Sequence, residues 1–217
     1  MMNTWGRCIV QVINTIHQLS KTIMSHYKKR SSQHRPFIVG VDGLGGSGKT
    51  TLAEALKGVF KNHASILHLD DYIVEKSRRY GTGNEEWHEY YALQWDIASL
   101  TTDLFQKLHH NLDILLPFYD STTDTIVQKN FHYAYDTVIL IEGVFLQRVE
   151  WRNFFDYVIY LDCPLETRIE RVIKRDVYLG DEQARIAKYE RRYWKAEDHY
   201  LLQNDPVGRA DVIFSER

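Results

Sequence analysis

The sequence predicts an α/β protein whose doubly wound parallel sheet has about five strands, with helices on both faces. Short apolar runs alternate along the chain with longer segments of helical periodicity. A glycine-rich loop follows the first of these runs, and acidic residues stand directly after two later ones. Both features are typical of a sheet that binds its ligand at the carboxyl ends of its strands.

Composition limits the class of protein. The chain has 217 residues, of which 44% are hydrophobic and 26% charged, so one globular domain with a small attachment is expected. A net charge of −2 gives no indication of nucleic-acid binding, and Cys8 and Cys163 lack the spacing of metal or redox sites. No apolar run approaches the length of a membrane span, and the N-terminus lacks a signal-peptide pattern. We therefore expect a cytoplasmic protein without membrane contact, and the sequence leaves a homo-oligomer open.

The first 36 residues are expected to form a helical extension. Residues 8–30 carry apolar side chains at helical spacing, and the cations at 28–30 suit a helix C-terminus. A polar link over 31–36 then leads to the main domain, which is expected over 37–217.

The loop at 43–50 is the most specific motif. Its sequence, Gly-Leu-Gly-Gly-Ser-Gly-Lys-Thr, fits the phosphate-loop pattern G-x-x-x-x-G-K-[ST], between a strand expected over 37–41 and a helix over 51–60. In such a P-loop, backbone N–H groups surround nucleotide phosphates, Lys49 reaches the β- and γ-phosphates, and the Thr50 hydroxyl binds Mg²⁺. The expected nucleotide contacts are Gly43, Gly45, Gly46, Ser47, Gly48, Lys49, Thr50 and Thr51.

Acidic residues follow two other predicted strands. The strand at 65–69 ends at Asp70, and the strand at 136–141 is followed by Glu142. Because these strand ends border the ligand crevice, we interpret Asp70 as part of the reaction site and Glu142 as a carboxylate beside the metal ion. Aspartate is commoner than glutamate in the second role. Capping is the alternative for both residues, and the role of Asp71 stays open.

The segment between these strands is expected to carry the substrate side of the site, over about 72–135. Residues 75–96 are rich in charged and aromatic side chains and form either a substrate lid or a packed excursion. A helix is predicted after Asp96, and a short hairpin over 113–119 and 125–129.

The C-terminal part of the chain predicts the remaining strands and a second mobile segment. Residues 176–185 have few apolar anchors and are expected to form a lid over the phosphates, followed by a long helix over 182–202. The remaining strands are predicted at 157–161 and 210–214. A helix over 165–175 places three arginines on one face, for which surface salt bridges are an alternative: Arg168, Arg171 and Arg175.

Together these motifs resemble the uridine kinase, phosphoribulokinase and pantothenate kinase group of P-loop kinases. The resemblance extends from about Phe37 to Phe214. None of the motifs after the P-loop is specific for this group by itself, but their common order and spacing are. The matching motifs are Gly-Gly-Ser-Gly-Lys-Thr-Thr (45–51), Asp70 with Tyr72, Pro-x-Tyr-Asp (117–120), Ile-Glu-Gly (141–143) and Arg-Ile-x-Arg-x-x-x-Arg-Asp (168–176).

This resemblance implies a P-loop NTPase-type fold and a kinase that uses ATP and Mg²⁺ to phosphorylate a hydroxyl of a small molecule. Asp70 matches the general base of the family and Glu142 the carboxylate near Mg²⁺, while Arg171 and Arg175 match arginines that close around adenine and phosphates. The implied catalytic residues are Lys49, Asp70, Arg171 and Arg175. The implied metal-associated residues are Thr50, Asp70 and Glu142, and the implied substrate contacts are Asp70, Tyr72, Tyr119 and Arg168.

Departures from the family pattern concern the acceptor. Residues 91–93, Tyr-Ala-Leu, stand where uridine kinases carry His-Pro-Asp, and Leu93 cannot hydrogen-bond a ribose hydroxyl. Residues 122–125 replace expected basic residues, and Leu-Gly-Asp at 179–181 replaces the Arg-Gly-Arg of the lid. A nucleoside is the leading acceptor, with a pantothenate-like acid or a sugar phosphate as alternatives. A non-catalytic ATP-binding module is a further alternative, against which Asp70 argues because binding alone needs no base.

Overall fold

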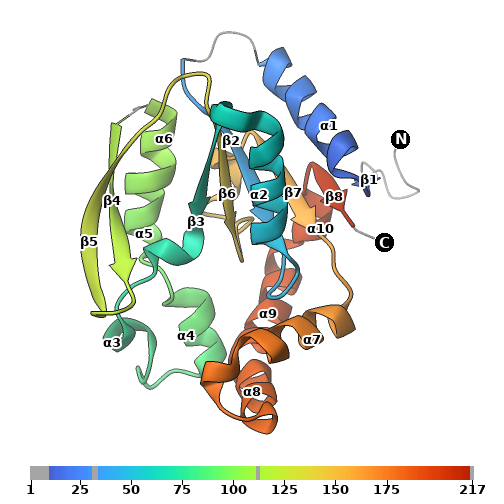
Figure 1. Ribbon diagram of the computed structural model, residues 1–217. Coiled ribbons are helices and arrows are strands. Elements are labelled where there is room, and N and C mark those ends of the chain that lie inside the picture. The colour runs from blue at the N-terminus through green and yellow to red at the C-terminus, as the bar shows by residue number, and fades with distance from the viewer. Residues whose placement is uncertain (1–9, 31–33, 111–112, 216–217) are drawn as a thin grey trace.

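A computed structural model describes residues 10–30, 34–110 and 113–215 of the chain. At its centre, these residues form a parallel six-stranded sheet in the order β1-β8-β7-β2-β6-β3 (Figure 1). The strands are β1 (Gln11–Ile13), β2 (Phe37–Asp42), β3 (Ala64–His68), β6 (Val138–Gly143), β7 (Tyr157–Leu161) and β8 (Val212–Phe214). The doubly wound α/β class is confirmed, and all five predicted strands are present.

The sixth strand, β1, lies where the sequence predicted the start of a helix. Gln11–Ile13 pairs in parallel with Val212–Phe214, and α1 (Ile16–Lys29) begins only after Thr15. The Thr15 hydroxyl accepts the N–H of Gln18, which caps the helix. The reason for the difference is local, because β-branched residues in this segment favour a strand, while apolar spacing alone does not separate the two structures. Cys8 and the predicted start at residue 8 lie outside the described residues, and the division at residue 36 stays a prediction.

Two cores pack on opposite faces of the sheet because successive strand residues point to opposite sides. Val39 faces a core shared with α1 and α2 (Lys49–Phe60). Ile38, the preceding residue, faces a second core with Leu104, Trp151 and Tyr200. The central strands are therefore buried on both faces, as their continuous apolar sequences require.

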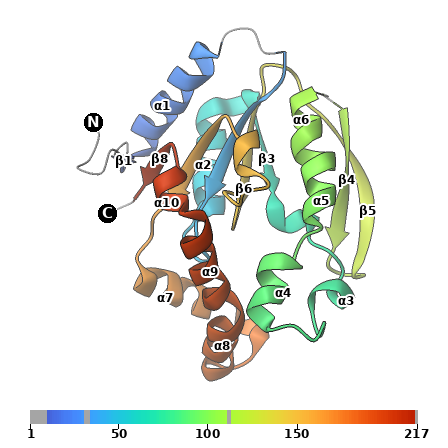
Figure 2. The ribbon, with the colours of Figure 1, turned by 180° about the vertical axis from the view of Figure 1, so that it is seen from behind.

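The other elements surround this sheet (Figures 1 and 2). A helix runs through α5 (Ile97–Leu100), a π-helical segment (Thr101–Gln106) and α6 (Lys107–His110), and a second runs through α8 (Glu182–Lys188), a π-helical segment (Tyr189–Trp194) and α9 (Lys195–Asn204). The predicted hairpin is formed by β4 (Asp113–Asp120) and β5 (Thr125–His132). The shorter helices are α3 (Lys76–Arg79), α4 (Glu86–Ala92), α7 (Leu165–Arg175) and α10 (Pro206–Arg209), with 3₁₀ turns at Lys61–His63, Leu69–Tyr72, Arg152–Phe154 and Val177–Leu179.

The carboxyl ends of the central strands mark where a site can form. In Figure 1 the arrows of β3 and β6 point towards the part of the molecule that holds α4, α7 and α8. Within the described residues, no helix combines the length and apolar character that crossing a bilayer requires.

Candidate active site

The loop between β2 and α2 has the backbone of a phosphate-binding loop. Gly46 and Gly48 have φ values of +76° and +100°, where a side chain would be strained. A Cβ at Gly46 would also approach the carbonyl oxygen of Arg168 to 2.8 Å. Because α2 begins at Lys49, the N–H groups and the dipole of its first turn are directed at any anion that the loop holds. The Lys49 ammonium donates to the Leu44 carbonyl oxygen at 3.0 Å, which folds this side chain over the loop.

Three neighbouring elements bring polar side chains together beside this loop. The Thr50 hydroxyl donates to Glu142 Oε1 at 3.0 Å, and His68 Nδ1 lies 2.7 Å from the same oxygen. The pairing of β2 with β6, and of β6 with β3, fixes this arrangement. Glu142 thus stands next to the first turn of α2, where the sequence predicted a carboxylate near the metal ion.

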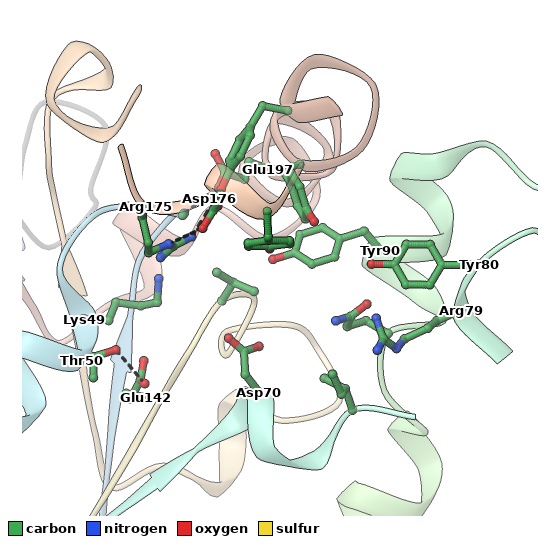
Figure 3. Close-up of a pocket in the computed structure, with 18 residues that line it drawn as sticks. Lys49, Thr50, Asp70, Arg79, Tyr80, Tyr90, Glu142, Arg175, Asp176 and Glu197 are labelled. Atoms are coloured by element: carbon green, nitrogen blue, oxygen red, sulfur yellow. Dashed lines mark hydrogen bonds and ion pairs between the residues drawn. The ribbon is translucent and has the colours of Figure 1, made fainter. Parts of the chain in front are cut away.

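Asp70 lies in a cavity of about 340 Å³ that Lys49, Thr50 and Glu142 also line (Figure 3). Its carboxylate is exposed to the cavity and makes no hydrogen bond to another described residue. The residues that surround the cavity desolvate this carboxyl, and this desolvation and the charge of Glu142 raise the pKa of Asp70, while Lys49 opposes the shift. Desolvation also lowers the pKa of Lys49 against the attraction of Glu142 and Asp70. Asp71 does not line this cavity.

Arg175 and Asp176 border the cavity from the end of α7. Arg175 Nε and Nη2 donate to the two Asp176 oxygens at 2.7 and 3.0 Å, and the Tyr189 hydroxyl donates to Asp176 as well. Burial acts to raise the pKa of Asp176, but these hydrogen bonds outweigh burial, so the pKa lies below its ordinary value. Asp176 therefore competes with phosphate oxygens for the Nε and Nη2 donors of Arg175.

Arg168 contacts the P-loop but does not line the cavity. Its Nη1 is 2.8 Å from Glu197 Oε2 and 3.3 Å from the Gly45 carbonyl oxygen. Glu197 Oε1 in turn accepts the Gly45 N–H at 2.6 Å, and both charged side chains are buried. These contacts fasten the loop to α7 and α9. They give no support to substrate contact by Arg168, which stays a prediction.

Arg171 contacts the loop from another side. Its Nη1 donates to the carbonyl oxygens of Gly46 and Ser47 at 3.3 and 3.1 Å. With Thr51 and Phe214 it lines a second cavity of about 280 Å³, separate from that of Asp70. Its predicted role in closing around the nucleotide stays a prediction.

The two tyrosines implied as substrate contacts do not line the Asp70 cavity. Tyr72 is buried in the core, and the Tyr119 hydroxyl accepts from Arg79 Nη2 at 3.2 Å and donates to Asp124 at 2.8 Å. Arg79 itself lines the cavity, so this arginine links Tyr119 to it. Direct contact of either tyrosine with a substrate stays a prediction without support from this geometry.

Sequence reasoning missed Glu197 and Gln94, which line the cavity, and the buried Asp42 directly before the P-loop. Asp42, at the end of β2, is fully buried and accepts hydrogen bonds from Tyr200 at 2.6 Å and Gln147 at 3.0 Å. An acidic residue inside an apolar strand, directly before the P-loop, was a signal that could have identified it. Glu197 and Gln94 offered no comparable signal, because their positions depend on partners distant in the chain.

The residues around Lys49 fit Mg²⁺ and a nucleoside triphosphate. The described residues contain no group of three or more His, Cys, Asp or Glu side chains arranged to hold a metal ion by themselves. Mg²⁺ in phosphate-transfer sites takes one or two protein oxygens and completes its shell with phosphate oxygens and water. The Thr50 hydroxyl and the carboxylates of Glu142 and Asp70 supply oxygens of this kind.

Known proteins share this sequence pattern and fold. A family model described as an AAA domain matches residues 39–190. A uridine kinase from Clostridium novyi is 30% identical over 145 residues, 66% of this chain and 69% of that protein, and one from Limosilactobacillus reuteri is 31% identical over 66% of each chain. The match thus spans about two thirds of these relatives.

Solved structures extend the comparison to almost the whole chain. A possible uridine kinase from Bacillus stearothermophilus is 44% identical, with a TM-score of 0.76 over 92% of this chain and 96% of that one. D-Glycerate 3-kinase from Cryptococcus neoformans, 12% identical with a TM-score of 0.61 over 92% and 95% of the two chains, shares the fold alone. The chain therefore belongs to the P-loop family that the AAA-domain model describes and, within it, to the uridine-kinase-like kinases, which are ATP-dependent phosphotransferases.

Proposed function

We propose that this protein transfers the γ-phosphoryl group of Mg·ATP to a hydroxyl of a small molecule, with a nucleoside as the leading acceptor. The observation that carries the proposal is the position of Asp70. Its carboxylate lies in one cavity with Lys49, Thr50 and Glu142, and it has no protein hydrogen-bond partner among the described residues. A carboxylate with a raised pKa in this position can accept the proton of an attacking hydroxyl.

Each residue then has a distinct task. The P-loop N–H groups and Lys49 hold the phosphates, and Arg175 can add a second positive charge once it leaves Asp176. Thr50 and Glu142 would hold the magnesium ion, which supplies charge neutralisation at the phosphate oxygens when it is bound. Asp70 orients the acceptor hydroxyl and takes its proton as the oxygen attacks the γ-phosphorus. The products are ADP and a phosphate ester.

The end of the cavity formed by Arg79, Tyr80, Tyr90 and Gln94, called here the acceptor end, supports a nucleoside. In Figure 3, Asp70 lies between Lys49 and Thr50 on one side and Arg79, Tyr80 and Tyr90 on the other. A molecule that places a hydroxyl at Asp70 can therefore extend towards the tyrosines, whose rings suit a planar base. The uridine kinase relatives agree with this choice.

The test is an ADP-release assay with Mg·ATP across nucleosides, pantothenate and sugar phosphates, with the product identified by mass spectrometry. We expect a nucleoside to give one nucleoside monophosphate per ADP, and EDTA to abolish the reaction. Turnover confined to pantothenate or a sugar phosphate would overturn the nucleoside assignment. Tight ATP binding without transfer to any acceptor would instead favour a binding module.

A further inference from the structure

His68, the last residue of β3, contacts the carboxylate proposed to lie beside the metal ion, but it stands outside the cavity. Its Nδ1 is 2.7 Å from Glu142 Oε1, and its side chain, which is 34% exposed, does not line the cavity that Glu142 shares with Asp70. Within the described part of the chain, Glu142 is the one hydrogen-bond partner of the ring. His68 can therefore affect a ligand in the cavity through Glu142 and not by contact.

The pairing of the strands places these two side chains next to each other. His68 and Glu142 are direct partners in the parallel register of β3 and β6, so both point to the same face of the sheet. Leu140, two residues before Glu142, packs in the core shared with α2, so this is the face that α2 covers. Thr50, in the first turn of α2, donates to the same Oε1 at 3.0 Å. Three neighbouring elements thus bring two donors to one carboxylate oxygen.

The contact also determines which tautomer of His68 is present. A carboxylate accepts hydrogen bonds and cannot donate them, so Nδ1 of the imidazole must carry a proton. The imidazolium ion and the neutral ring protonated on Nδ1 both meet this condition. The hydrogen bond to Glu142 therefore does not depend on the charge of the ring.

Together the two donors restrict the rotation of the Glu142 carboxylate. The last torsion of a glutamate side chain is broad, so its two oxygens exchange places unless neighbours hold one of them. Thr50 and His68 both hold Oε1, whereas Oε2 makes no hydrogen bond to a described residue. Because Glu142 lines the cavity, Oε2 is the oxygen left for a ligand there. Thr50 is itself expected to bind the metal ion, so His68 is the donor that stands outside the metal site.

We propose that His68 is a positioning residue for the magnesium site: its Nδ1–H group holds Oε1 of Glu142 and so keeps Oε2 available to the magnesium ion. The inference rests on the proposed function, in which Glu142 lies beside Mg²⁺. Side chains that contact a metal-binding residue and not the metal typically change metal affinity or activity by about 10- to 100-fold when they are removed.

The test measures the binding of Mn²⁺ to the complex of the protein with ADP by electron paramagnetic resonance, without an acceptor. Mn²⁺ takes the same oxygen ligands as Mg²⁺. His68→Leu removes the donor and keeps a branched side chain, so the Kd for Mn²⁺ should rise by about tenfold or more. His68→Asn places an amide N–H as many bonds from the backbone as Nδ1, so the Kd should stay within about threefold of the wild-type value.

The matched control is His132→Leu, which should leave the Kd unchanged. It breaks a contact of His132 Nδ1 with Asp113 Oδ1 that has the same length, 2.7 Å, but lies on the exposed hairpin. In a Glu142→Gln background, the effect of His68→Leu should largely disappear, because both residues act through one carboxylate. Thermal melting shows whether each variant is folded.

Three results would overturn the inference and leave the kinase proposal intact: wild-type Mn²⁺ affinity in folded His68→Leu, equal losses in the leucine and asparagine variants, or additive effects of His68→Leu and Glu142→Gln. Wild-type Mn²⁺ affinity in Glu142→Gln alone would show that Glu142 does not serve the metal ion, and the inference would fail with that part of the proposed function. Turnover is assayed separately, so its absence would count against the proposed reaction and not against the role of His68.

Discussion

The two ends of the cavity are built in different ways. The phosphate end consists of backbone N–H groups and two side chains from the contiguous residues 43–50, joined by Glu142. The acceptor end takes side chains from α3, α4 and the segments beside them, and the buried pair of Arg192 and Glu89 holds these together. Every ATP presents the same phosphates, so a continuous motif can bind them. Acceptors differ, and a site made of separate side chains can change with them.

The largest effect is expected at the phosphate end. Lys49→Ala removes the one ammonium group of the P-loop, so turnover should fall by about 10³-fold or more. The measurement is ADP release with the preferred acceptor, together with a thermal melt. Lys57→Ala, on the exposed part of the same helix, is the control and should retain activity. Near-normal turnover in a folded Lys49 variant would contradict the proposed phosphate site.

A smaller but still large effect is expected between the two ends, at Asp70. Asp70→Asn keeps the shape and removes the basicity, so turnover should fall by about 10²- to 10⁴-fold with little change in ATP affinity. Because the pKa of Asp70 is raised, wild-type kcat/KM should rise with pH as this group loses its proton. The Asp70→Asn variant should not show this rise. Asp71→Asn, one residue away and outside the cavity, is the control. Equal losses in both variants would point to another base.

Arg168 either stabilises the P-loop through Glu197 or contacts the substrate, and one substitution distinguishes these two roles. Arg168→Ala leaves the Glu197 carboxylate buried without its cation, so the free energy of unfolding should fall by about 3 kcal/mol. Lys174→Ala is the control: it breaks an exposed ion pair with Glu170 and should change the free energy of unfolding by less than about 0.5 kcal/mol. Urea unfolding measures both. A raised KM for the acceptor without loss of stability would instead favour the predicted substrate contact.

The pH dependence of this variant follows from Glu197. Burial raises the pKa of this carboxyl and Arg168 opposes the shift, so removal of Arg168 should raise the pKa further. A carboxyl with a raised folded-state pKa stabilises the protein at low pH, and this contribution is lost as pH rises through that pKa. The stability deficit of Arg168→Ala should therefore grow as pH rises through the folded-state pKa of Glu197 in the wild-type protein and towards the higher pKa in the variant. A deficit that shrinks over this range would contradict the arrangement.

The smallest change is expected in the lid, where no chemistry takes place. Residues 176–185 should exchange amide hydrogens faster without nucleotide than with a non-hydrolysable ATP analogue, because Arg175 can leave Asp176 for phosphate oxygens only when these are present. Hydrogen-exchange mass spectrometry measures this difference. Equal protection in both states would argue against lid closure.

The same contrast explains what the sequence could predict. The strands, the P-loop and the carboxylates after β3 and β6 were predictable, because each depends on a local pattern or on its position at a strand end. Substrate roles for Tyr72, Tyr119 and Arg168 came from motif resemblance, and the structure places these side chains outside the cavity. Glu197 contacts Gly45 only through tertiary packing, so no spacing in the sequence could have predicted this hydrogen bond.

The pairing of β1 with β8 has a consequence for the order in which the molecule can be assembled. The first described strand lies beside the last, and the Ser215 N–H donates to the Ile13 carbonyl oxygen at 3.0 Å. During synthesis this side of the sheet cannot be completed until the residues of β8 have left the ribosome, and such non-local pairing is slow to form. Until then, a bare strand edge is available to other nascent chains. We expect β1 to join the sheet late and then to protect this side of it from association with other chains.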